Sequence, residues 1–172
     1  MENSSKKIQL QVLISMYDYH TKMFTNVLAD ISDKNAQNRL GTKANHVAWL
    51  AGSLVYQRQF LANALGKDVK QRSENLFKAS PGEGHKGIQD NVTYPSLEEY
   101  KQDWEKISSA LKDALENLSE EQLNGPDPYQ MPGGNFTLFD SITFSVDRES
   151  YCLGQIGLYR RLLGYDAMKY PE

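Results

Sequence analysis

The sequence predicts an all-α fold, a four-helix bundle in a single domain that spans residues 1–172. The first observation is that long stretches lack proline, since none of the six prolines comes before Pro81 and none falls between Gly133 and Pro171. A proline inside a helix removes a hydrogen bond, so these stretches are where long helices can form. The second observation is that apolar residues recur there at steps of three and four, whereas no alternation lasts long enough for a sheet.

The first two predicted helices cover residues 5–31 and 42–65. Their apolar faces are formed by Leu13, Met16, Tyr17, His20, Phe24, Val27, Leu28 and Ile31 in the first, and by Val47, Leu50, Leu54, Phe60, Leu61 and Leu65 in the second. Thr42 is the expected N-cap of the second helix, because its hydroxyl can accept a backbone N–H. Gly66 is expected just after the end of that helix, where a left-handed conformation favours glycine.

Residues 67–95 are expected to form a long, irregular crossover between the second and third helices, because their prolines and glycines leave no sustained period. Ser96 and Glu99 then form a capping box, the side-chain exchange that marks a helix start, and open the third helix over residues 96–118. A second capping box at Ser119 predicts one short additional turn.

The fourth predicted helix covers residues 137–163. Thr137 caps it with Asp140 at the third helical position, and Gly164 ends it. Its inward face is expected to carry Leu138, Ile142, Ser145, Arg148, Cys152, Gln155 and Tyr159.

Composition excludes several classes of protein. The chain is 40% hydrophobic and 24% charged with a net charge of −3, which argues against a nucleic-acid binder and a membrane-surface protein. The longest uncharged stretch, residues 44–57, is too short and too polar to span a bilayer. The N-terminus lacks an apolar signal segment, so we expect a cytoplasmic protein. The single cysteine, Cys152, excludes a disulfide framework.

The three histidines do not form a metal-binding pattern, since no H-x-x-x-H, H-E-x-x-H or E-x-x-H occurs. His20 falls on the apolar face of the first helix and is expected at the edge of the core with one nitrogen satisfied. His46 is expected to make a hydrogen bond at the start of the second helix. His85 lies among glycines in the crossover and is expected to be solvated.

Arg148 is the unusual residue of the fourth helix, because a buried guanidinium must be paired, bind an anion, or extend to the edge of the bundle. The expected inward stripe holds no acid, so its partner would be an acid of another helix such as Asp18, backbone carbonyls, or a bound anion. Cys152 is expected to be a small buried apolar residue. Gly154 and Gly157 suggest a close approach to another helix or another chain.

Two segments, residues 45–55 and 149–164, resemble the second and last helices of the DinB-like family of bacterial bundle proteins, and residues 134–138 resemble its lead-in to the last helix. The four-helix layout matches over nearly the whole chain. The family typically carries a divalent metal, usually nickel or zinc, on three histidines. The matching positions here are Ser53 on the second helix and Arg148 and Cys152 on the last.

This departure from the family pattern implies a bundle without the metal cofactor. Serine is a poor ligand, arginine is none, and a fixed guanidinium repels a divalent cation. The family's metal-dependent transferase or hydrolase chemistry is therefore not implied for this chain.

Two hypotheses follow for the function. The first is a metal-free binding or structural module, in which a small anion occupies a candidate pocket and the chain forms a homodimer. The candidate pocket is made of Arg148, Cys152, Ser53, His20 and His46. The second is an enzyme with a displaced site that uses His20, Cys152 or Tyr17 at the mouth of the bundle, or a metal if His20, His46 and Cys152 converge. The sequence favours the first hypothesis, and the second is the alternative.

Overall fold

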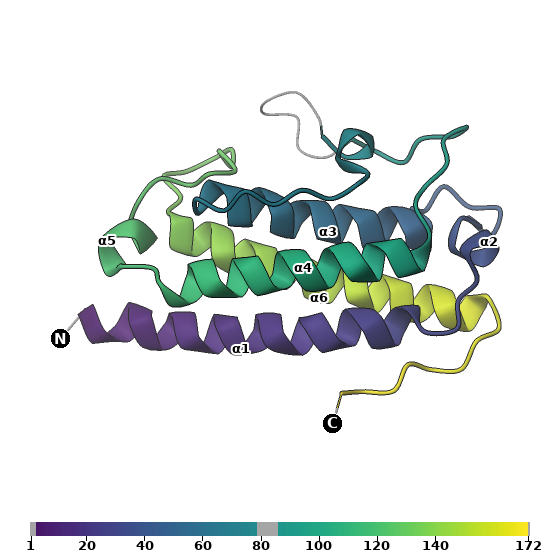
Figure 1. Cartoon of the computed structure of the whole chain (residues 1–172), viewed down its shortest axis with the longest axis horizontal. Helices are drawn as coiled ribbons and strands as arrows, with labels where there is room; N and C mark the ends of the chain where they lie inside the picture. Colours follow the sequence, from purple (N-terminus) through teal and green to yellow (C-terminus); the bar gives the residue numbers. More distant parts are fainter. Residues whose placement is uncertain (1–2, 79–85, 172) are drawn as a thin grey trace.

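The computed structural model describes residues 3–78 and 86–171, and within them regular structure is helical apart from isolated bridge positions such as the pair Pro126 and Thr137. Four long helices lie side by side (Figure 1). These are α1 (Asn3–Leu28), α3 (Val47–Ala64), α4 (Leu97–Glu116) and α6 (Leu138–Leu162), and the short elements are α2 (Asp33–Ala36), η1 (Glu74–Leu76) and α5 (Glu120–Leu123). The predicted all-α class is confirmed.

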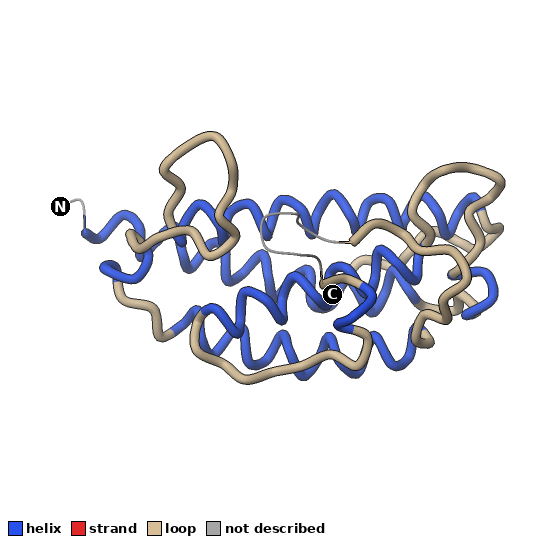
Figure 2. Tube along the Cα trace, turned by 90° about the horizontal axis from the view of Figure 1, so that it is seen from above, coloured by secondary structure: helices blue, strands red, loops and turns tan. Residues whose placement is uncertain are grey.

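Contacts between the helices fix their directions. Trp104 donates to the Thr21 carbonyl and Lys112 pairs with Asp18, so α4 runs against α1. The α1 helix runs parallel to α6, because His20 meets Glu149 near the middle of both helices and Gly157 lies beside Val27 further along both. The α3 and α4 helices run in the same direction, so the long connection between them returns along the length of the bundle (Figures 1 and 2).

The predicted caps are largely confirmed. Ser96 with Glu99, and Thr137 with Asp140, form complete capping boxes at the starts of α4 and α6. Ser119 opens the short α5 in the same way.

Two predicted boundaries were wrong. The α3 helix begins at Val47 rather than near residue 42, because the His46 ring accepts the Trp49 N–H and acts as N-cap. Thr42 instead stabilises the preceding turn, where its hydroxyl donates to the Arg39 carbonyl. The α1 helix ends at Leu28 rather than residue 31, since Asp30 takes a left-handed φ of 65°.

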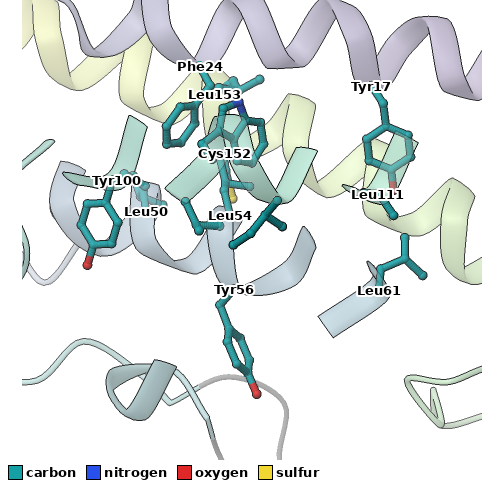
Figure 3. Packing of buried hydrophobic residues seen from close by; sticks show 14 of the residues in the cluster. Tyr17, Phe24, Leu50, Leu54, Tyr56, Leu61, Tyr100, Leu111, Cys152 and Leu153 are labelled. Carbon is teal, nitrogen blue, oxygen red and sulfur yellow. The ribbon is translucent and has the colours of Figure 1, made fainter. Parts of the chain in front are cut away.

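The apolar core runs through the centre of the bundle (Figure 3). Within it Phe24 stacks on Trp104 with ring centroids 4.3 Å apart. Gly52 on α3 has a packing reason, because a Cβ there would lie 2.4 Å from the Phe77 ring and 2.5 Å from the Tyr100 hydroxyl. The crossover and α4 can therefore pack closely against α3. None of the helices in the described ranges is long and apolar enough to cross a membrane.

Candidate functional site

A buried ion pair joins α3 and α6. Arg58 donates to both carboxylate oxygens of Glu149, from Nε at 2.6 Å and from Nη2 at 2.7 Å. The two residues are 1% and 0% exposed. Such a pair is tolerated in a core only when its remaining hydrogen-bonding groups are also satisfied.

Those further partners come from the other two long helices. The Arg58 guanidinium also donates to Thr21 Oγ1 at 2.7 Å and to Ser108 Oγ at 2.6 Å. It lies over the Trp104 ring, 3.6 Å from the ring centroid. Arg58 therefore links all four long helices through one planar group.

Glu149 also contacts His20 on α1. His20 Nδ1 lies 3.0 Å from Glu149 Oε2. Burial alone would raise the pKa of Glu149, but the Arg58 charge and hydrogen bonds, together with His20, bring that pKa below its ordinary value. Glu149 is therefore ionised at neutral pH. The other ring nitrogen, His20 Nε2, lies 3.1 Å from the Ser150 hydroxyl.

The expectation that the inward face of the last helix holds no acid was wrong, because Glu149 is fully buried there. The buried surface of α6 is wider than the predicted stripe and includes Val146, Glu149 and Leu153. Sequence reasoning also missed Arg58. Its position between Leu54 and Leu61, four residues after one and three before the other, was the available signal.

Arg148 is the residue that the DinB-like resemblance matched to a metal-binding histidine of that family. Its guanidinium donates to the Gln57 side-chain oxygen and, at 2.5 Å, to Ser53 Oγ. The structure thus brings Arg148 and Ser53 together across α3 and α6. The suggested partner Asp18 is instead paired with Lys112, at 2.7 Å.

Cys152, one turn after Arg148, is buried and carries a free thiol among apolar side chains (Figure 3). Burial raises the pKa of this thiol, so it is a poor nucleophile and a poor metal ligand. A guanidinium, a hydroxyl and a protonated thiol do not fit a divalent metal. Residues 3–78 and 86–171 also hold no group of three or more His, Cys, Asp or Glu side chains that could bind one.

The remaining candidates lie elsewhere. His46 caps α3 and meets Tyr94 edge to face at 4.8 Å, and burial lowers its pKa to about 4. The Tyr17 hydroxyl is directed at the Ile142 carbonyl, 3.5 Å away, and burial raises its pKa. His20 is hydrogen-bonded to Glu149 of the buried ion pair. His85 lies outside the described residues. The five residues of the predicted pocket therefore do not converge.

A groove of about 720 Å³ lies between α1 and α6. Its lining is mainly apolar and is completed by the C-terminal segment, which is held over α1 by a hydrogen bond from Asn26 to the Lys169 carbonyl. The lining residues are Val12, Ser15, Met16, Tyr19, His20, Met23, Ser150, Leu153, Gly154, Gly157, Arg161, Ala167, Met168 and Tyr170. His20 and Ser150 thus connect the buried ion pair to this groove.

The two glycines suspected of close helix contact lie in the same groove. A Cβ on Gly157 would be 3.8 Å from Val27, which is an ordinary contact, and a Cβ on Gly154 would meet nothing described within 4 Å. Within the chain neither glycine is required by a close helix crossing.

The sequence matches no known family profile and no curated protein. Among solved structures, the fold is similar to that of a conserved protein of a locus from Enterococcus faecalis, with a TM-score of 0.64 and 16% identity. The similarity covers 88% of this chain and 95% of that one. At this identity the likeness shows a shared fold alone, and the DinB-like resemblance stays a prediction.

Proposed function

We propose that this chain is a DinB-like bundle protein that works without the family's metal and binds a small molecule in the groove between α1 and α6. The single observation that carries the proposal is the groove itself, which has the volume and the mostly apolar lining typical of small-molecule sites. Met16, Met23 and Leu153 supply an apolar wall. The proposed molecule therefore has an apolar body of moderate size.

The charge of the lining favours an acidic group on that molecule. Arg161 carries a permanent positive charge, and none of the described lining residues is acidic. The sequence-based hypothesis placed an anion beside Arg148. Because Ser53 and Gln57 hydrogen-bond that guanidinium, the groove is the better supported location. The proposal keeps the cytoplasmic location expected from the sequence.

The test is a thermal unfolding series with three probes at submillimolar concentration. Decanoate combines an apolar chain with a carboxylate and should raise the midpoint by several degrees, because selective binding to the folded state stabilises it. Decanol lacks the charge and phosphate lacks the chain, so both should shift the midpoint less. Equal shifts with decanoate and decanol would contradict the charged group, and no shift with either would contradict the groove.

A second copy of the chain is the rival occupant of this face. The two helices that form the groove also carry exposed apolar residues, including Ile8 at 63% and Leu158 and Leu162 at 60% each, and exposed apolar patches often mark protein contacts. The hollow shape of the groove and the charge of Arg161 in its lining favour a small molecule. The homodimer expected from the sequence remains a separate prediction.

A further inference from the structure

Two side chains of the groove and one buried behind them follow one another in a hydrogen-bonded chain. Ser150 Oγ lies 3.1 Å from His20 Nε2, and His20 Nδ1 lies 3.0 Å from Glu149 Oε2. A nucleophilic hydroxyl, a base and an orienting carboxylate are connected in this order, through these same ring atoms, in enzymes that use an activated serine. Ser150 and His20 both line the groove, whereas Glu149 is fully buried behind them.

The surroundings of Glu149 determine which ring nitrogen carries the proton. An ionised carboxylate only accepts hydrogen bonds, so His20 donates its Nδ1–H to Glu149. In the tautomer that a base requires, Nε2 then presents a lone pair to the Ser150 hydroxyl, whose single proton can be donated to Nε2 at 3.1 Å or to the Val146 carbonyl at 3.3 Å. Arg58 keeps Glu149 ionised and fixed, and it thereby positions the ring indirectly.

We propose that Ser150 is the nucleophile of an esterase activity on esters of apolar carboxylic acids, with His20 as the base and Glu149 as a positioning residue. The inference rests on the proposed groove, whose apolar wall would hold the acyl chain. Tyr19 lines the same groove and supplies an O–H donor for the carbonyl oxygen.

The reaction balances with water as the only co-reactant. Ser150 Oγ attacks the carbonyl carbon and forms a new C–O bond, while its proton passes to His20 Nε2. The bond to the alcohol breaks, and the alcohol leaves with that proton. Water then attacks the acyl–Ser150 ester and gives a proton to His20 Nε2. The bond between the acyl carbon and Ser150 Oγ breaks, Oγ takes that proton back from His20, and the carboxylic acid is released.

The first test uses an alkyl fluorophosphonate with a ten-carbon chain, which attaches to activated serines, read by intact mass and peptide mapping. One equivalent should attach at Ser150. Ser150→Ala should remove the label, and His20→Gln should slow labelling by roughly 100-fold, the usual scale for a lost base. Ser109 is an exposed serine on α4 outside the groove, so Ser109→Ala should label like the wild type.

A second variant pair guards against a His20→Gln protein that does not fold. Ser150 and Ser109 are both exposed, so cysteine is tolerated at either position. Ser150→Cys should react with iodoacetamide at least tenfold faster than Ser109→Cys, because a nearby histidine promotes the thiolate. Equal alkylation rates, or fluorophosphonate labelling that ignores Ser150, would overturn the proposal.

The outcomes separate this inference from the proposed function. Decanoate binding without labelling of Ser150 leaves the binding function standing and removes the esterase. Labelling at Ser150 that decanoate does not slow supports the nucleophile and contradicts the binding of decanoate in the groove.

Discussion

Arg58 on α3 holds both carboxylate oxygens of Glu149 on α6, in a pair from which water is excluded. The same guanidinium bonds Thr21 on α1 and Ser108 on α4. Because each of these contacts needs its own helix at one height along the bundle, the pair fixes the register of all four helices. It also holds the carboxylate that orients His20 toward the groove.

Replacing Arg58 by methionine should unfold the protein far more easily. Arg58→Met leaves the Glu149 carboxylate buried without its cation, and breaking such a pair costs about 3–5 kcal/mol. Urea denaturation should show this loss in the free energy of unfolding.

The matched control removes both charges. Arg58→Met combined with Glu149→Leu should recover a large part of the loss, since apolar replacement of a whole buried pair is often neutral. A single variant as stable as the wild type would show that the pair does not hold the bundle.

His46 should make stability depend on pH. Burial lowers its folded pKa from 6.5 to about 4, so between these values the unfolded chain binds more protons than the folded one. Stability contributed by the neutral ring is therefore complete above about pH 6.5 and falls as the pH drops toward 4. His46→Asn keeps an N-cap acceptor without this titration. Melting midpoints from pH 7 to 4 should decline less in this variant, and parallel declines would refute the assignment.

Zinc or nickel should leave the melting midpoint unchanged, and so should a chelator. The reason is that Ser53, Arg148 and Cys152 stand at the positions where the DinB-like pattern has histidines, and Arg148 donates a hydrogen bond to Ser53 there. The resemblance also predicts that the triple variant with histidine at these three positions responds to metal. A metal-dependent rise in the wild type would contradict the metal-free account.

Light scattering tests the predicted homodimer. The mass should be close to twice 19.5 kDa at tens of micromolar. Leu158→Asp and Leu162→Asp change exposed apolar residues of α6, and together they should return the mass to that of one chain. A wild type that already scatters as one chain would end this prediction.

Local signals predicted the fold well. The periodicity of apolar residues gave the four long helices, and the capping boxes at Ser96, Ser119 and Thr137 gave three helix starts to the residue. The start of α3 was missed because its cap is the ring of His46, which accepts the Trp49 N–H in place of a hydroxyl. Caps are readable when the residue type has few other roles, and histidine has many.

The site was less predictable because it depends on contacts between distant segments. Arg148 and Ser53 were expected together and lie together, but the pairing of Arg58 with Glu149 joins residues 91 positions apart. A charged residue in a helix is predicted to face solvent unless a buried partner for it is known. Predicting the groove likewise requires the path of the C-terminal segment, because residues of that segment complete its lining. The helical pattern does not determine this path.

Calorimetric titration of decanoate into a protein whose groove has been filled tests directly whether the groove between α1 and α6 binds a small molecule. A Cβ on Gly154 would meet none of the described residues within 4 Å, so Gly154→Phe places a ring in the groove while improving helix propensity. Gly87→Phe puts the same ring on an exposed loop position that is equally open. We expect decanoate to bind saturably to the wild type and to Gly87→Phe, and at least tenfold more weakly to Gly154→Phe. Equal binding to all three proteins, or none to the wild type, would contradict it.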